Sequence, residues 1–260
     1  MHRFSANLGF LWSDLPLLER IDRAASAGFR AIELHWPYDT PADAVRKACE
    51  KHRLTLLGIN TAVGDAALGE FGLGALAGRE ADFQAAIDQS LAFCRNSGAN
   101  AVHAMAGIVP SRERAKARDI FLRNLAEAAQ KAAAQGVTLL LEPINPRDKP
   151  DYFYSTVGEA VSIIEDLRSD TVRLMFDAYH VGVAEGDVIM KLRRYKDLIG
   201  HVQIAAVPSR TEPDEGEISY SAIFAELRNI GYAGFIGCEY KPRAKVEDGL
   251  VWTSKLNAWQ

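Results

Sequence analysis

The chain has 260 residues, of which 48% are apolar and 25% charged, and its 30 basic and 34 acidic residues give a net charge of −4. No apolar run approaches the roughly 18 residues that span a bilayer, and no basic segment is concentrated enough to neutralise many phosphates. These features exclude membrane, collagen-like and disordered chains, and we expect neither a membrane nor a nucleic acid as partner.

The cysteines and the start of the chain indicate a cytoplasmic protein. Three cysteines, an odd number and widely spaced, favour reduced thiols over a disulfide framework. The first residues, MHRFSANLGF, lack the pattern of a secretory signal.

A recurring phrase organises the chain: an alanine-rich helical stretch ends in glycine, and a short apolar run follows. The glycines of this phrase are Gly28, Gly98, Gly136 and Gly231. Glycine suits the left-handed conformation that ends helices, and a short apolar run is typical of a strand buried on both faces. The spacing of these glycines corresponds to repeating units of about 32 to 38 residues, the size of one strand plus one helix.

This period predicts eight strands, near Phe4–Leu8, Ala31–Leu34, Leu54–Asn60, Ala101–Met105, Thr138–Leu141, Val172–Phe176, His201–Ile204 and Phe235–Cys238. It predicts helices over Leu15–Ala27, Ala42–Lys51, Glu80–Asn96, Arg112–Gln135, Val157–Leu167, Val188–Tyr195 and Ser221–Asn229. Eight alternations favour a single α/β domain over 1–260, a closed (β/α)8 TIM barrel. An open doubly wound sheet is the alternative, but it would usually have a glycine-rich phosphate loop after the first strand, where this chain has ANLGFLWSD.

The least regular segment is 62–78, which contains five glycines and follows the third predicted strand. A glycine-rich loop at the carboxyl end of a barrel strand is a candidate lid over an active site. A flexible surface loop is the alternative.

Polar residues follow the predicted strands, at the end of the barrel where active sites form. In the first half of the chain they are Asn7, Glu33, His35, Asn60 and His103. In the second half they are Glu142, Asp177, His180, Gln203 and Glu239. A carboxylate behind an apolar strand is costly to bury unless it is paired or binds a metal.

Four of these residues, Glu142, Asp177, Gln203 and Glu239, lie on four neighbouring strands and would converge. Their oxygen donors suit Mg²⁺ or Mn²⁺, whereas zinc would be expected to use more histidine or cysteine. Salt bridges or helix caps at the barrel rim are the alternative for each carboxylate alone. For His35 and His103, ordinary hydrogen-bonded packing is the simpler interpretation.

The chain resembles the hydroxypyruvate isomerase family of xylose-isomerase-like barrels, and within it the 2-oxo-tetronate isomerase branch. The matching phrases include RFSANLGFLW, NTAVGD, GEFGLGALAGRE, LLLEPIN, FDAYH, GHVQIA, EPDEGEISY and GCEYKPR, which cover almost the whole chain. The resemblance implies the same four metal ligands and assigns proton transfer to Glu142 and Glu239. The phrases GINTAVGD and IAAVPSR lack a His-Asn pair and an Asp found in some hydroxypyruvate isomerases, which favours the oxo-tetronate branch.

The implied reaction moves a proton between adjacent carbons of a small keto sugar acid through an enediolate. A metal that touches both substrate oxygens would spread the developing charge, and two carboxylates can remove and return the proton. We expect His180 to polarise a substrate oxygen and Arg210 to pair with the substrate carboxylate. For Arg210, a solvated surface position is the alternative.

Three other functions compete with this interpretation. A ketose 3-epimerase on the same barrel usually has histidine where this chain has Gln203. A metal-dependent nuclease needs more histidines and a basic groove, and a non-catalytic sugar-binding barrel has no need for two convergent glutamates. The sequence is compatible with a homo-oligomer.

Overall fold

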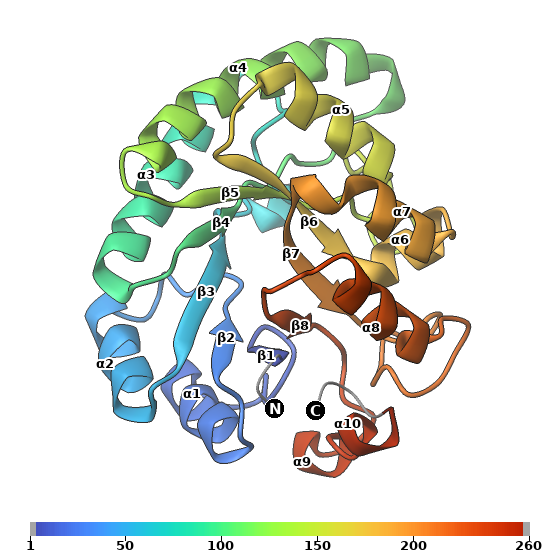
Figure 1. The fold of residues 1–260 in the computed structure, drawn as a ribbon. Coiled ribbons are helices and arrows are strands. Elements are labelled where there is room, and N and C mark those ends of the chain that lie inside the picture. The colour runs from blue at the N-terminus through green and yellow to red at the C-terminus, as the bar shows by residue number, and fades with distance from the viewer. Residues whose placement is uncertain (1–3, 257–260) are drawn as a thin grey trace.

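The computed structural model describes residues 4–256. Eight parallel strands close into a barrel in the order β1 to β8, and β8 pairs with β1 (Figure 1). Helices surround the barrel on the outside. The predicted closed (β/α)8 barrel is therefore confirmed, and the open doubly wound sheet is excluded.

The strands are β1 (Phe4–Asn7), β2 (Ala31–Glu33), β3 (Thr55–Asn60), β4 (Ala101–His103), β5 (Thr138–Leu141), β6 (Val172–Asp177), β7 (Ile199–Ile204) and β8 (Ile236–Cys238). Every predicted strand is present, with ends shifted by at most two residues. The largest differences are at β4, which ends earlier than expected, and at β7, which begins earlier.

The main helices are α1 (Leu17–Ser26), α2 (Ala42–His52), α3 (Glu80–Ser97), α4 (Arg114–Ala133), α5 (Val157–Leu167), α7 (Val188–Tyr195) and α8 (Tyr220–Asn229). All seven were predicted. The sequence interpretation missed three short helices, α6 (Ala178–Ala184), α9 (Val246–Gly249) and α10 (Trp252–Lys255), and three 3₁₀ turns, η1 (Ala66–Leu68), η2 (Ser111–Glu113) and η3 (Lys196–Leu198).

Local sequence signals explain several helix ends. The four glycines that were predicted to end helices all have positive φ angles, between 66° and 91°. Helix α5 begins with a capping box: the Thr156 side chain accepts from the Glu159 backbone N–H, and the Glu159 side chain accepts from the Thr156 N–H. These signals determine where the outer helices begin and end, and so where each following strand of the barrel can start.

The C-terminal segment completes the ring of helices between α8 and α1 (Figure 1). Trp252 of α10 is fully buried and packs edge-on against Phe4 of β1, with 5.0 Å between ring centroids. It also stacks on Phe224 of α8 and donates from Nε1 to the Tyr240 hydroxyl at 3.1 Å. A single tryptophan thus joins the last helix to the first strand, to α8 and to the segment that follows β8.

Strand register brings the polar strand ends to one end of the barrel. Asn7 of β1 pairs with Glu33 of β2, and Asp177 of β6 pairs with Gln203 of β7. Because parallel strands all run in the same direction, their carboxyl ends meet at one rim. A separate cavity of about 570 Å³ lies inside the barrel toward the amino ends of the strands. Glu33 and Gln203 line the part of this cavity that is nearest to the polar rim.

The glycine-rich segment 62–78 divides into two parts. Residues 72–75 are buried, and the N–H of Gly74 donates to the Met105 carbonyl at 3.1 Å. Residues 65–69 are exposed. Residues 72–75 could not move away without exposing their buried contacts, so the predicted lid, which stays a prediction, applies to residues 65–69 and not to 72–75.

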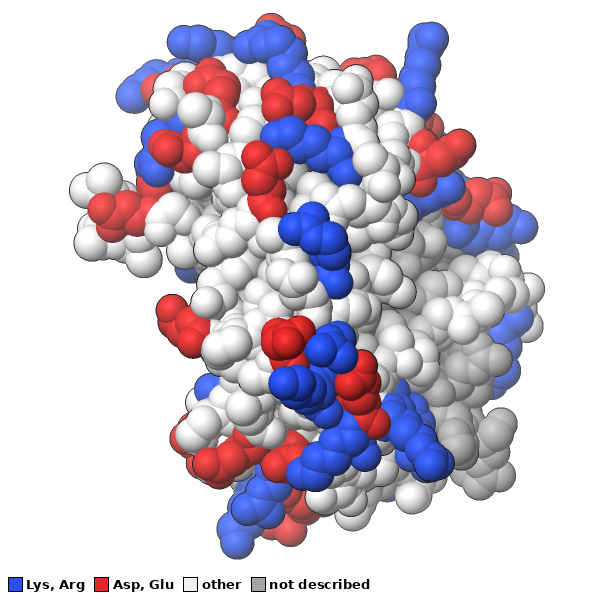
Figure 2. Space-filling view, turned by 90° about the vertical axis from the view of Figure 1, so that its left-hand side faces the viewer, with Lys and Arg blue, Asp and Glu red and all other residues white. Residues whose placement is uncertain are grey.

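Surface charge is mixed where it can be seen in Figure 2, on the side of α2 and α3. Lys and Arg side chains lie beside Asp and Glu side chains on this face. The ion pairs of α2 include those of Arg46 with Asp43 and Glu50. Within residues 4–256, no helix is both long and apolar enough to cross a membrane. The cysteines Cys49, Cys94 and Cys238 are free thiols and are buried.

Candidate active site

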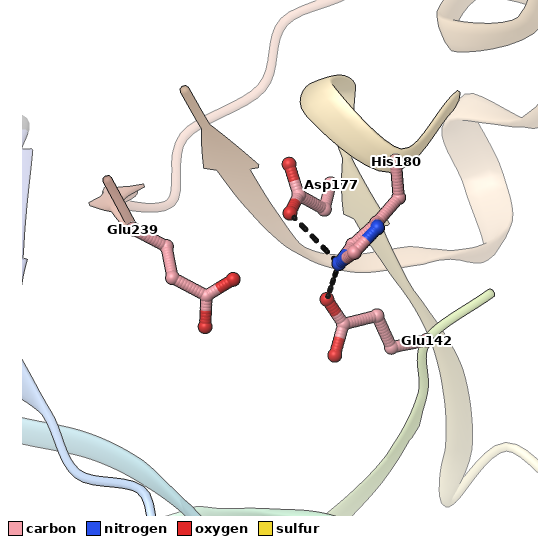
Figure 3. Close-up of side chains that lie close together, drawn as sticks. All are labelled: Glu142, Asp177, His180 and Glu239. Carbon is pink, nitrogen blue, oxygen red and sulfur yellow. Dashed lines mark ion pairs between the residues drawn. The ribbon is translucent and has the colours of Figure 1, made fainter. Parts of the chain in front are cut away.

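Three predicted site carboxylates and one histidine converge at the carboxyl end of the barrel (Figure 3). Glu142 follows β5, Asp177 ends β6, His180 lies in the first turn of α6 and Glu239 follows β8. One ligand atom from each of the four lies within 4.8 Å of the other three, and all four residues are buried. The structure therefore brings together residues that are nearly one hundred positions apart in the chain.

Glu239 is surrounded by donors. Its Oε1 accepts from Asn7 Nδ2 at 3.0 Å and lies 3.0 Å from His35 Nε2, while its Oε2 accepts from Arg210 Nη2 at 2.9 Å. Burial alone would raise the pKa of Glu239, but the His35 hydrogen bond and the Arg210 charge outweigh it and lower the pKa to about 2.

Glu142 and Asp177 have the opposite surroundings. Glu142 Oε1 and Asp177 Oδ2 are buried and have no hydrogen-bond partner among the described residues. Burial raises the pKa of Glu142 well above its ordinary value, and the charges of Glu239 and Asp177 raise it further. Burial, followed by the charge of Glu239, raises the pKa of Asp177 to about 8. Negative charge in this cluster is thus incompletely balanced by protein groups.

His180 has hydrogen-bond donors facing both of its ring nitrogens. The backbone N–H of Asn145 points at His180 Nδ1 at 3.3 Å, and the Arg210 guanidinium nitrogen Nη2, which can only donate, lies 3.4 Å from His180 Nε2. Nε2 also lies 3.6 Å from Asp177 Oδ2 and 3.7 Å from Glu142 Oε1. Burial, aided by the charge of Arg210, lowers the pKa of His180 to about 3 and keeps the ring neutral.

Arg210 lies inside the site and is not a solvated surface residue. Its Nη1 pairs with Asp148 Oδ2 and its Nη2 with Glu239 Oε2, both at 2.9 Å. The guanidinium also lies over the rings of Phe10 and Tyr179, 4.8 and 4.9 Å from their centroids. Arg210 adopts φ +56°, a left-handed conformation that is uncommon for a residue with a Cβ and typical of functional sites.

Gln203, the fourth predicted ligand, lies directly beside Asp177 in the barrel. Its Nε2 donates to Glu33 Oε2 at 2.9 Å and approaches Glu239 Oε1 at 3.4 Å. Its Oε1 is buried and has no partner in the described part of the chain. The nitrogen end of the amide is therefore engaged by the protein, and the oxygen end is not.

A cavity of about 460 Å³ opens onto this cluster. Its lining includes two histidines that the sequence interpretation assigned to ordinary packing, His35 and His103. His103 Nδ1 lies 3.3 Å from Glu142 Oε2, and burial lowers its pKa to about 4. Both histidines touch a site glutamate, a contact that only the folding of distant strands could reveal.

Lysines also line this cavity, and the sequence interpretation did not single them out. Lys149 Nζ lies 3.9 Å from the centroid of the Phe71 ring, and Lys241 lies near the exposed edge. Neither ammonium forms an ion pair with a carboxylate within residues 4–256, whereas Arg210 forms two. The sequence carried no signal for Lys149, because it follows no strand end directly.

Comparison with known families identifies the fold family. A family model described as the xylose isomerase-like TIM barrel matches residues 21–256. The chain belongs to this family. The resemblance noted in the sequence is thereby confirmed at the level of the family.

Several relatives match the chain over almost its whole length. The chain is 46% identical to a 2-oxo-tetronate isomerase of Cupriavidus necator over 253 residues, which cover 97% of each chain. It is 34% identical to a hydroxypyruvate isomerase of Escherichia coli, with 97% of this chain and 98% of that protein covered. A solved structure described as AP endonuclease, family 2, from Brucella melitensis is 39% identical and has a TM-score of 0.95, with 98% of this chain and 99% of that chain covered.

The donor set of the site fits a hard divalent cation. Three of the four predicted ligands, Glu142, Asp177 and Gln203, each have one buried oxygen without a hydrogen-bond partner in the part of the chain that is described. Buried polar atoms of this kind are rare in folded proteins and require an explanation. Oxygen donors converging on one point suit Mg²⁺ or Mn²⁺.

Proposed function

We propose that this chain is a divalent-metal-dependent isomerase of a small 2-keto sugar acid, a 2-oxo-tetronate or hydroxypyruvate. The observation that carries the proposal is the convergence of Glu142, Asp177 and Glu239 beneath a cavity of about 460 Å³. The names of the full-length relatives from Cupriavidus necator and Escherichia coli support the same activity.

Glu142, Asp177, Gln203 and Glu239 would hold Mg²⁺ or Mn²⁺. When bound, the cation would supply positive charge that stabilises the negative charge developing on the two substrate oxygens. This role agrees with the charge of the site, where a single guanidinium, that of Arg210, faces three clustered carboxylates.

Proton transfer is assigned to Glu142 and Glu239. One carboxylate removes the proton from the substrate carbon that bears the hydroxyl, and the C–H electron pair forms the double bond of an enediolate. The other carboxylate returns a proton to the neighbouring carbon, while the hydroxyl proton moves between the two oxygens. The products of these steps are a carbonyl and a hydroxyl in exchanged positions, so no oxidant or reductant is required.

His180 and Arg210 would contact the substrate. His180 directs its Nε2 toward the carboxylates of the cluster, and the tautomer that is protonated there would donate to a substrate oxygen. Arg210 is already paired with Asp148 and Glu239, so any contact of Arg210 with a substrate anion would compete with these two carboxylates. Lys149, which has no carboxylate partner among residues 4–256, offers a further cation for the substrate carboxylate in the same cavity.

A nuclease and a ketose 3-epimerase would each require different residues at this site. A nuclease, the activity in the description of the Brucella melitensis structure, would be expected to use several histidines as metal ligands. Among the described residues, the cluster formed with Glu142, Asp177 and Glu239 contains one histidine, His180. A ketose 3-epimerase would act on neutral sugars and has no need for an unpaired lysine in the cavity.

A substrate panel tests the proposal. Metal-stripped protein should be inactive, and added Mg²⁺ or Mn²⁺ should restore interconversion of 2-oxo-tetronates or hydroxypyruvate, measured by NMR. Epimerisation of free ketoses in place of this reaction would favour the epimerase. Full turnover after exhaustive chelation would remove the metal from the mechanism.

A further inference from the structure

Glu33 is a buried carboxylate that the proposed mechanism does not use. It ends β2, is 5% exposed, and does not line the cavity above the carboxylate cluster. Its Oε1 accepts from Ser5 Oγ at 2.5 Å and lies 3.1 Å from His201 Nε2, and its Oε2 accepts from Gln203 Nε2 at 2.9 Å. Glu33 therefore acts on the site without touching the cavity, through its charge and through the side chains that it holds.

Gln203 is the neighbour that connects Glu33 to the site. The oxygen and nitrogen ends of a glutamine amide have almost the same shape, so only their partners decide which end faces which way. A carboxylate oxygen attracts the N–H end and repels the carbonyl end. Glu33 therefore selects the orientation in which Nε2 is engaged and Oε1 has no partner among the described residues.

The contact between Glu33 and Gln203 is built into the barrel interior. Gly237 of β8 lies directly opposite Gln203 in register. A Cβ at this glycine would lie 2.3 Å from Glu33 Oε1 and 2.8 Å from Gln203 Cγ. Any larger residue would have to displace one of the two side chains, so the glycine makes room for the contact.

We propose that Glu33 is a positioning residue of the metal centre: by accepting the Gln203 N–H it presents the Gln203 oxygen to the cation. This inference rests on the proposed metal-dependent function. Residues that orient a metal ligand through hydrogen bonds affect metal affinity without touching the metal. Among the predicted ligands only Gln203 needs such help, because a carboxylate offers an oxygen whichever way it turns.

The first test measures Mn²⁺ affinity of the substrate-free protein by isothermal titration calorimetry. In Glu33→Gln the substituted amide can accept as well as donate, so the Gln203 amide is free to turn its nitrogen toward the cation. We expect Mn²⁺ affinity to fall by about 10- to 100-fold, the range typical of such partners. The matched control is Glu226→Gln, which removes the ion pair of another buried glutamate with Arg193 outside the barrel and should leave the affinity unchanged.

The second test exchanges the two side chains. The double variant Glu33→Gln with Gln203→Glu keeps the net charge and reverses the hydrogen bond, with the amide on β2 now donating to a carboxylate on β7. That carboxylate offers an oxygen in either orientation. We therefore expect the exchange to recover most of the Mn²⁺ affinity lost in Glu33→Gln.

The outcomes separate this inference from the function on which it rests. Absence of Mn²⁺ and Mg²⁺ binding by the wild-type protein would overturn both. Wild-type binding with an unchanged affinity in folded Glu33→Gln would overturn the inference alone. If Glu33→Gln does not fold, the double variant decides: affinity near that of the wild type supports the positioning role, and a loss of 10-fold or more overturns it.

Discussion

Glu142 and Glu239, the two glutamates that we assign to proton transfer, differ sharply in their surroundings. Glu239 receives hydrogen bonds from Asn7 and Arg210, whereas Glu142 has a buried oxygen without a partner among residues 4–256. Burial raises the pKa of Glu142, and the contacts of Glu239 lower its pKa to about 2. Two carboxyl groups whose pKa values are driven apart are typical of acid–base sites.

Replacing either glutamate should stop the reaction and leave the fold intact. Glu142→Gln and Glu239→Gln keep the side-chain volume but replace the basic carboxylate by an amide, which does not accept a proton near neutral pH. We therefore expect kcat to fall by about 10²- to 10⁴-fold. Exchange of the substrate proton with D₂O, followed by NMR, measures the step directly, and circular dichroism checks the fold. Near-normal rates in either variant would contradict the two-carboxylate scheme.

Lys149 should select for an acidic substrate. Its ammonium lies over the Phe71 ring in the site cavity and has no carboxylate partner within the described chain. In Lys149→Met we expect KM for the keto acid to rise by about 10-fold with little change in kcat, because a charge-assisted hydrogen bond contributes about 1.5 to 3 kcal/mol. Lys149→Arg, which keeps the charge, is the control, and an unchanged KM in Lys149→Met would refute this role.

At the scale of elements, the segment that follows β3 combines a fixed and a free part. Residues 72–75 are buried beside the chain that follows β4, and Gly74 bonds to the Met105 carbonyl. Residues 65–69 are exposed, and Leu68 at their centre is 77% exposed. Phe71, three residues further along the chain, lines the cavity above the carboxylate cluster, so an exposed apolar side chain at position 68 suits a loop that closes over a ligand.

Hydrogen–deuterium exchange tests this closure. A substrate analogue should slow amide exchange in 64–70, because ordering of the loop removes its N–H groups from water. Residues 72–75 serve as an internal control, since they are buried already and should change little. Equal exchange in 64–70 with and without the analogue would rule out a lid.

At the scale of the whole molecule, Trp252 joins the last turn of the helix ring to the barrel. Its ring contacts those of Phe4 and Phe224, and its N–H reaches the Tyr240 hydroxyl. Val246 of α9 is also buried, and Lys255 of α10 pairs with Asp214 at 2.8 Å, so Trp252 is the largest of several contacts that hold this segment.

Removal of this side chain should destabilise the barrel. We expect Trp252→Ala to lower the free energy of unfolding by about 3 to 5 kcal/mol, as is typical for a buried aromatic ring. The neighbouring Val251 is 55% exposed, and Val251→Ala should stay within about 0.5 kcal/mol of the wild type. Urea unfolding followed by circular dichroism compares the two, and equal stability would show that α10 contributes little to the fold.

The barrel was predictable from the sequence because its signals are local. Glycines at helix ends and short apolar runs depend on neighbouring residues only, and they located all eight strands and the seven main helices. Helices α9 and α10 escaped prediction because each has four residues, too few to show a helical period, and tertiary contacts hold them: Glu247 accepts from Trp12, and Trp252 packs on Phe4 and Phe224.

The sequence by itself also determined which strand ends carry Glu142, Asp177, Gln203 and Glu239, since parallel strands in a barrel end at one rim. Only the tertiary structure decided what each of these side chains faces. The partners come from the other half of the chain: His35 and Asn7 reach Glu239, and Glu33 reaches Gln203. Such contacts depend on barrel closure and side-chain rotamers, which no periodicity along the chain records.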